Sequence, residues 1–141
     1  MVVYNVNFVA VLVSAVAAMA IGMLWYGPLF GKKWMKLSGI SEKQAKKGME
    51  KGMAGMAPQM VAQLVASAVM AFVLSMFMSL VGATGVMGGL TVAFWAWLGF
   101  VATVSLSSVL WEGKSVELYA LNNGSMLVTL LVQGAILAAM A

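Results

Sequence analysis

Few side chains in this sequence could perform acid–base chemistry. The chain has no histidine, cysteine, arginine or aspartate, and its four acidic residues are all glutamates. Outside the lysine-rich segment that follows Gly31, the acid or base candidates are Glu112, Glu117 and Tyr119. The missing residue types remove Ser-His-Asp and Cys-His nucleophiles, imidazole metal ligands and paired aspartates. We therefore expect a protein that is not an enzyme and that holds no cofactor or metal.

The tripeptide Asn122-Asn123-Gly124 is the most concentrated polar feature within an apolar stretch. Two other apolar stretches end in aromatic residues that should lie at the same depth as these amides. One functional interpretation is a small polar pocket at the membrane rim. Its candidate residues are Trp25, Tyr26, Trp111, Glu112, Asn122 and Asn123. The structural interpretation is that the two asparagines and Gly124 cap or kink the start of a helix. A poorly hydrated amide needs a partner, so we expect Asn122 or Asn123 to bond near Trp25–Tyr26 or Trp111–Glu112.

Further polar side chains fall inside apolar stretches. Gln63 and Gln133 add amides, and Thr103, Ser105 and Ser107 make one stretch rich in hydroxyls. These groups could line a polar path through a bundle, or they could simply hydrogen-bond between helices. The stretches hold no ionisable residue at mid-depth, which argues against a proton-coupled antiporter that uses a buried carboxylate.

Methionines recur at helical spacing in the lysine-rich segment, at Met49, Met53, Met56 and Met60. Thioethers are soft ligands that can bind Cu(I). The stripe contains no cysteine or histidine, and 14 methionines are spread over the chain. We therefore interpret it as the apolar face of a short amphipathic helix that begins near Glu42, after a capping box at Ser41 and Gln44.

The composition places all these groups in a membrane. Of 141 residues, 63% are hydrophobic and 9% are charged, whereas a soluble domain carries about 25% charged residues. Four stretches are long enough to cross a bilayer, at about 6–26, 59–81, 90–111 and 118–140. The predicted fold is all-α: a transmembrane bundle of four helices that forms a single integral membrane domain over residues 1–141.

The charges predict the orientation of the bundle. Seven of the eight lysines lie between the first two stretches, and Glu112, Lys114 and Glu117 lie between the last two. Four spans place both charged connections on one side, and the lysine excess marks it as cytoplasmic, with both termini outside. A cleavable signal peptide ending near Ala20 is the alternative for the first stretch. No lysine precedes that stretch, however, and its apolar run continues to Trp25.

Small residues recur every fourth position in the predicted helices. These stripes comprise Ala10, Ser14, Ala18 and Gly22; Ser67, Ala71, Ser75 and Ser79; Gly99, Thr103 and Ser107; and Ser125 and Thr129 followed by Gln133. Small residues allow helix backbones to approach closely in lipid, where no hydrophobic force drives association. We expect these stripes to pack the bundle internally. The alternative is that one of them forms a contact between subunits.

Three segments resemble one family. They are the run from Leu24 to Trp34 (LWYGPLFGKKW), the segment from Trp97 to Thr103, and Glu112-Gly113 followed by Leu121–Gly124. They are similar to a bacterial family of small four-helix membrane proteins, domain of unknown function 1761. The resemblance extends over nearly the whole chain. It implies a four-helix membrane fold in the bacterial cytoplasmic (inner) membrane, and it implies no activity.

The leading functional hypothesis is a non-enzymatic bundle that assembles with itself, as a homo-oligomer, or with another membrane protein in a larger complex. It rests on the small-residue stripes and on the missing catalytic side chains. The rival hypothesis is a small oligomeric transporter or channel lined by the hydroxyl-rich third helix. The expected surroundings are the lipid bilayer, and the net charge of +4 is a topology signal with no nucleic-acid partner implied.

Overall fold

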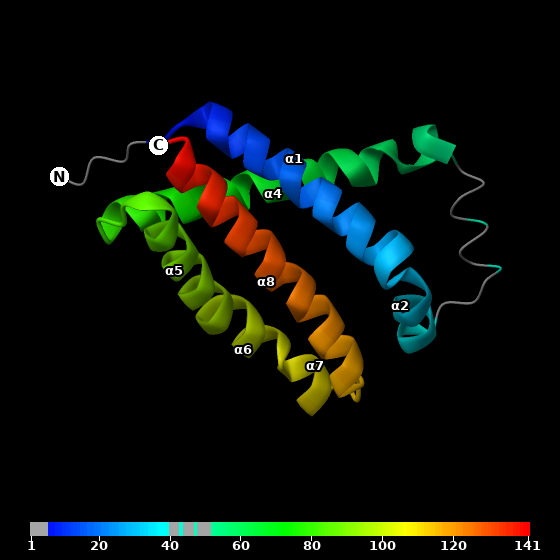
Figure 1. The fold of residues 1–141 in the computed structure, drawn as a ribbon. Helices are drawn as coiled ribbons and strands as arrows, with labels where there is room; N and C mark the ends of the chain where they lie inside the picture. Colours follow the sequence, from blue (N-terminus) through cyan, green and yellow to red (C-terminus); the bar gives the residue numbers. More distant parts are fainter. Residues whose placement is uncertain (1–5, 40–42, 44–46, 48–51) are drawn as a thin grey trace.

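A computed structural model describes residues 6–39, 43, 47 and 52–141, except for the side chains of 52–54 and 56. Over this part of the chain every regular element is a helix (Figure 1). In order, the elements are α1 (Phe8–Leu24), η1 (Trp25–Leu29), α2 (Gly31–Ser38), α4 (Gly52–Leu80), α5 (Gly85–Trp97), η2 (Leu98–Ala102), α6 (Thr103–Ser105), α7 (Ser107–Leu110) and α8 (Val116–Ala139).

Four helical segments are long and apolar enough to cross a membrane. They run over Phe8–Leu29, Ala57–Leu80, Gly85–Leu110 and Val116–Ala139. The predicted four-helix bundle is therefore confirmed, with two of the helices beginning earlier than expected. The third helix begins at Gly85, whereas the sequence predicts a start at residue 90, because Gly88 and Gly89 are typical of a connection between helices. The second helix also begins earlier, at Gly52, and continues through Pro58.

Side-chain caps explain where two of the spans begin. The Asn7 side chain accepts hydrogen bonds from the backbone N–H groups of Val9 and Ala10, at 3.0 and 3.3 Å, and so starts α1. The Ser115 hydroxyl accepts from the N–H of Leu118 at 3.1 Å and starts α8. These caps satisfy N–H groups that have no partner within the helix. Gly113, with a φ of 71°, makes the left-handed turn that α8 follows.

The end of α1 bends the chain into the short helix α2. The segment η1 has π-type geometry, non-helical angles at Gly27 (φ −106°, ψ −106°) and Pro28, which lacks an N–H donor. In α2 the three lysines are exposed, whereas Trp34, Met35 and Leu37 are partly buried. This amphipathic helix lies closer to α1 than the predicted one. The predicted start at Glu42, together with Met49, falls outside the described residues, whereas the backbone of Met53, Met56 and Met60 belongs to α4.

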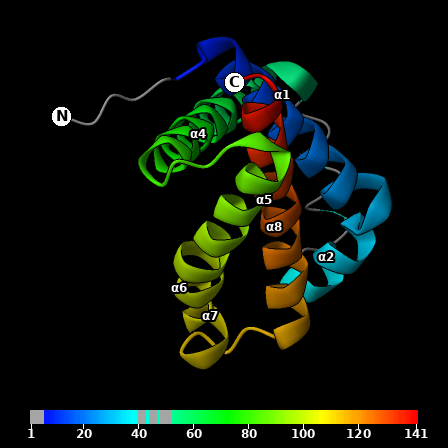
Figure 2. The same ribbon diagram turned by 60° about the vertical axis from the view of Figure 1, so that its left-hand side comes forward.

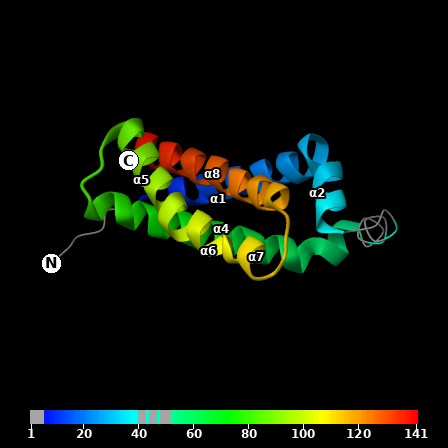
Figure 3. The same ribbon diagram turned by 90° about the horizontal axis from the view of Figure 1, so that it is seen from below.

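Helix α8 occupies the centre of the packing. The chain from α5 to α7 runs beside it, and α1 packs against both α4 and α8 (Figures 2 and 3). The closest approach joins Gly89 to Gly134, where an added Cβ on Gly134 would lie 2.5 Å from the Gly89 carbonyl oxygen. Two glycines are needed there because any side chain would collide with backbone.

The bundle has two distinct ends. At one end, the Asn7 side-chain amide donates to the Met140 carbonyl at 2.8 Å. At the other end, α2 and residues 113–115 line one cavity together. We call this second end the lysine end, since it carries Lys32, Lys33, Lys36 and Lys114. The two charged connections thus share one end of the molecule.

Candidate functional site

Tyr26 and Asn122 meet at the lysine end. The Tyr26 hydroxyl donates to Asn122 Oδ1 at 2.8 Å. The predicted hydrogen bond between the asparagine pair and the Trp25–Tyr26 end of the first span is therefore present. It crosses from η1 to Asn122, which lies in the second turn of α8. Its role is interhelical, because Ser115 caps α8, and the interpretation of Asn122-Asn123-Gly124 as a helix cap is wrong.

Gly124 creates space for an aromatic ring. A Cβ at this position would lie 3.3 Å from Trp25 Cζ2, so the indole ring rests directly on the α8 backbone. The indole N–H donates to the Leu121 carbonyl at 3.1 Å. Phe30 packs beside this indole, with ring centroids 4.8 Å apart. Trp25 therefore fixes the end of α1 against α8 through both packing and a hydrogen bond.

Asn123 makes a second network on the opposite side of α8. Its side chain is 5% exposed. It donates to the Tyr119 carbonyl at 2.9 Å and accepts from the Ser105 hydroxyl at 2.8 Å. The Trp97 indole N–H donates to the Asn123 carbonyl at 2.9 Å, and the Tyr119 hydroxyl donates to the Ala102 carbonyl at 2.6 Å. These bonds tie α8 to the third span at three levels, and they explain why Trp97 lies inside that span.

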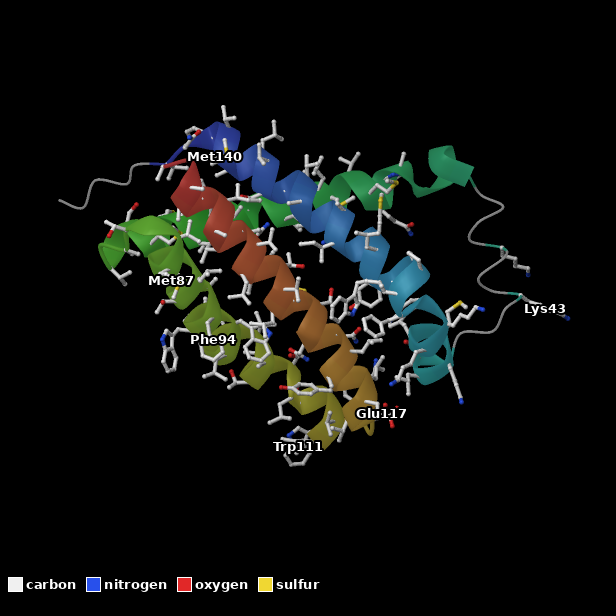
Figure 4. The ribbon with its side chains drawn as sticks, in the orientation of Figure 1. Lys43, Met87, Phe94, Trp111, Glu117 and Met140 are labelled. Carbon is white, nitrogen blue, oxygen red and sulfur yellow. The ribbon has the colours of Figure 1, made fainter. Side chains whose placement is uncertain are left out.

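Trp111 and Glu112 do not join these networks. Trp111 is 85% exposed, Glu112 is also exposed, and Figure 4 shows Trp111 pointing away from the bundle. The structure therefore does not bring Trp111 and Glu112 together with Asn122 in one pocket. A cavity of about 670 Å³ does lie at this rim. Its lining is Trp34, Leu37, Ser38, Gly113, Lys114, Ser115, Leu118 and Asn122. Of the predicted rim residues, only Asn122 belongs to it.

A second cavity of about 580 Å³ lies between α1, α4 and α8. We call it the cleft. Its lining is Ala18, Met19, Gly22, Met23, Tyr26, Gln59, Met60, Gln63, Ser67, Met70, Ser125, Met126 and Thr129. Several of these residues stand out in the sequence one by one, as members of small-residue stripes or as amides within the spans. Their meeting in one cavity could not be predicted, because the cavity depends on where α4 diverges from α1.

Gln133 lies next to the inner end of the cleft. Its side chain is fully buried, and its Nε2 donates to the carbonyls of Ser14 and Ser67 at 3.2 and 3.3 Å. The amide thus joins α8 to α1 and α4. Gln133 Oε1 and the Ser14 hydroxyl are buried without a hydrogen-bond partner among the described residues. Such atoms are uncommon, because leaving a buried polar group unpaired costs about 1–3 kcal/mol.

The small-residue stripes divide into two classes. The stripes of α1 and α4 face inward: Ala10, Ser14, Ala18, Ser67, Ala71 and Ser75 are all buried, and Gly22 and Ser79 are half-buried. Ser125 and Thr129 of α8 are buried too. By contrast, Gly99, Thr103 and Ser107 of the third span are exposed. The internal face of that span is instead formed by Gly89, Ala93 and Ala102, which no motif in the sequence indicates.

The hydroxyl groups of the third span bond locally or to α8. Thr103 donates to the Gly99 carbonyl at 2.7 Å, Ser107 to Val104 at 3.1 Å and Ser108 to Ser105 at 2.8 Å. Ser105 reaches Asn123 of α8. Of these four hydroxyl groups, that of Ser105 makes a bond between helices, whereas those of Thr103, Ser107 and Ser108 bond within the third span. Met60, the last member of the methionine stripe, lines the cleft; Met49 and the side chains of Met53 and Met56 lie outside the described residues.

Comparison with known proteins identifies a family. No characterised protein and no solved structure is significantly similar to the chain. A family model described as "Protein of unknown function (DUF1761)" matches residues 9–138, nearly the whole chain and all four candidate spans. This is the family that the LWYGPLFGKKW run resembled. The chain therefore belongs to the DUF1761 family of proteins of unknown function.

Proposed function

We propose that this protein is a non-enzymatic membrane bundle whose copies assemble through the outer face of the third span. One observation carries the proposal: Gly99, Thr103 and Ser107 are exposed, while the equivalent stripes of α1 and α4 are buried within the bundle. An exposed small-xxx-small pattern is the surface on which membrane helices approach one another. The buried stripes already have partners within the same chain.

The local backbone supports this face as a contact surface. A Cβ added to Gly99 would have no neighbouring atom within 4 Å, so another backbone has room to approach there. Gly99 also lies within η2, a turn of π-type helix. Single π-type turns are often found at functional sites. Here the extra residue in the turn rotates the helix, and so helps to place Gly99 outward while Ala93 and Ala102 face inward.

Bulky substitution at Gly99 tests the proposal. The Gly99→Leu variant should convert an oligomer to monomers in lipid discs, as measured by native mass spectrometry, while the monomer stays folded. Ala20→Leu is the matched control, since Ala20 is an exposed small residue of α1 outside the cleft. A wild-type protein that is monomeric in native-like lipid overturns the proposal. Additional mass from a different protein would instead support assembly in a mixed complex.

The proposed location is the bacterial cytoplasmic membrane, with the lysine end inside and both termini outside. The lysine excess of that end supports this orientation, because positive residues favour the cytoplasm. Two variants, Ser38→Cys and Thr84→Cys, provide the test, because the natural chain has no cysteine that would react in the background. The thiol reagent cannot cross the cytoplasmic membrane, and it is applied to cells in which the outer membrane alone has been permeabilised. It should label Thr84→Cys and not Ser38→Cys. Labelling of Ser38→Cys alone would reverse the orientation.

An oligomeric transporter or channel is the second candidate, and it depends on the same exposed face. Thr103 and Ser107 carry their hydroxyl groups there, where copies around an axis would bring them together. Replacement by Val and Ala removes both hydroxyl groups at similar size. A solute or ion flux in vesicles that this double variant abolishes, while the oligomer persists, would favour transport. Assembly without any flux would favour the first proposal.

A further inference from the structure

The cleft between α1, α4 and α8 has the lining of a ligand site. Its volume of about 580 Å³ falls in the range of small-molecule pockets, about 300–1,000 Å³. Six of the lining residues bear hydrogen-bonding side chains: Tyr26, Gln59, Gln63, Ser67, Ser125 and Thr129. Ser67, Ser125 and Thr129 are buried by helix packing, whereas Gln59 and Gln63 are exposed on the cleft wall, where packing does not explain their amides.

The remaining lining is apolar and adaptable. Five methionines contribute to it, at positions 19, 23, 60, 70 and 126. Methionine side chains are unbranched and flexible, and they fit apolar ligands of varied shape. None of the cleft-lining residues carries a charge. A charged group placed among them would lose its hydration without gaining an ion pair, which is costly at this depth.

The inner end of the cleft supplies a second, independent observation. Ser67 lines the cleft and accepts a hydrogen bond from Gln133 through its carbonyl. Gln133 lies one helical turn beyond Thr129, and Ser14 lies one turn beyond Ala18, both of which line the cleft. Gln133 and Ser14 do not themselves line the cleft, so their unpartnered atoms Gln133 Oε1 and Ser14 Oγ lie behind its wall. Buried atoms of this kind are usually satisfied by an ordered water molecule, which could join them to a ligand in the cleft.

We propose that the cleft binds an uncharged amphiphile, a molecule with a hydrocarbon chain and a hydroxyl- or carbonyl-bearing end. The methionines contact the chain, and the amides and hydroxyl groups of η1, α4 and α8 bind the polar end. The absence of charge from the lining selects neutral molecules over phospholipids. This site is separate from the third-span face proposed for assembly, so either proposal can fail without the other.

Photolabelling in lipid discs tests the site. The probe is a monoacylglycerol with a diazirine in its chain, added to protein in phosphatidylethanolamine and phosphatidylglycerol. Labelling of cleft peptides from α1, α4 and α8 should saturate, and unlabelled monooleoylglycerol should suppress it. Hexadecane, which lacks a polar end, should not compete. Equal competition by hexadecane, or unsaturable labelling spread over exposed faces such as that of α5, overturns the proposal in favour of bulk lipid.

Two variants connect the labelling to the cleft. Gly22→Leu adds a side chain in the cleft, and because a Cβ at this position would meet nothing within 4 Å, folding should survive. Gln63→Leu keeps the size of the side chain and removes one amide. Each variant should raise the probe concentration needed for half-maximal labelling by about tenfold, which corresponds to about 1.4 kcal/mol of binding free energy. Ala20→Leu, on the exposed side of α1, should leave it unchanged. Saturable labelling that ignores both cleft variants refutes the assignment, even if the probe binds elsewhere.

Discussion

Helix α8 packs against its neighbours in two different ways. Against α5 the two backbones touch at Gly89 and Gly134, and the Asn123 network continues the contact toward the lysine end. Against α1 and α4 the packing is close around Ser14, Ala18 and Ser67 but opens beyond them into the cleft. The α5 side of α8 thus has direct backbone contact and a hydrogen-bond network, whereas the other side packs closely over part of its length and then opens into the cleft.

The difference between the two sides shows how small residues and amides act together in lipid. Small residues bring backbones into contact, as at Gly89 and Gly134, and an amide such as Asn123 then bonds across the contact. Where small residues give way to Gln63 and methionines, the helices diverge and the polar groups face a cavity. We infer that the α5–α8 side provides stability and that the cleft side provides the capacity to bind.

The largest expected effect comes from the glycine contact. Gly134→Ala should destabilise the bundle by about 3 kcal/mol, because the new methyl group overlaps the Gly89 carbonyl, 2.5 Å away. Gly22→Ala, on the cleft side, should be neutral or more stable by up to about 1 kcal/mol, since alanine favours the helix. Unfolding in mixed micelles with increasing dodecyl sulfate measures both. Equal stability of the two variants would remove the distinction between the sides.

The asparagine pair should show an intermediate effect that again differs by side. Asn123→Leu removes the bonds to Tyr119 and Ser105 from a buried site and should cost about 2 kcal/mol. Asn122→Leu removes one bond, to Tyr26, at a half-buried site and should cost about 0.6 kcal/mol. The same micelle titration ranks them. Tyr26→Phe combined with Asn122→Leu should cost no more than either change alone, because both remove the same bond.

The smallest effect is expected at Gln133. Gln133→Met keeps the volume and removes two long hydrogen bonds together with one unpartnered acceptor, so stability should change by less than about 1 kcal/mol. A larger loss would mean that Gln133 Oε1 has a partner in the membrane, such as a water molecule or the bound amphiphile. Titration with and without monooleoylglycerol separates these cases, since only a ligand-dependent loss varies with the lipid added.

Some of this architecture could be predicted because it depends on composition along the chain. Spans, charged connections and the depth of Trp25 and Asn122 follow from hydropathy and from the number of crossings. The Tyr26–Asn122 bond was predictable because it required two groups at one depth and a poorly hydrated amide. The start of the third helix was not, since Gly88 and Gly89 are typical of connections and are helical here through packing against α8.

Other features depend on the rotation of each helix about its axis, which the sequence indicates only weakly. The sequence predicts that Trp111 lies at the depth of Trp25, but Trp111 faces outward while Trp25 packs on Gly124. The stripe at Gly99 resembles the one at Ser14 in sequence, and it is exposed because a π-type turn intervenes. The cleft was likewise unpredictable, because it arises where α4 separates from α1 beyond Ala18 and Ser67.

The contact between Gly89 and Gly134 also constrains how such a protein can evolve. In an ordinary core, a larger residue on one helix can be offset by a smaller one on its neighbour, so sequences drift while the packed volume stays constant. Here both positions already hold the smallest residue, and the contact is between backbones. A larger residue at one position cannot be offset by a smaller one at the other, because no residue is smaller than glycine. Neither glycine can therefore be replaced by a pair of compensating substitutions. Relatives that keep this helix crossing should therefore keep both glycines, and those that have lost one should have moved α5 away from α8.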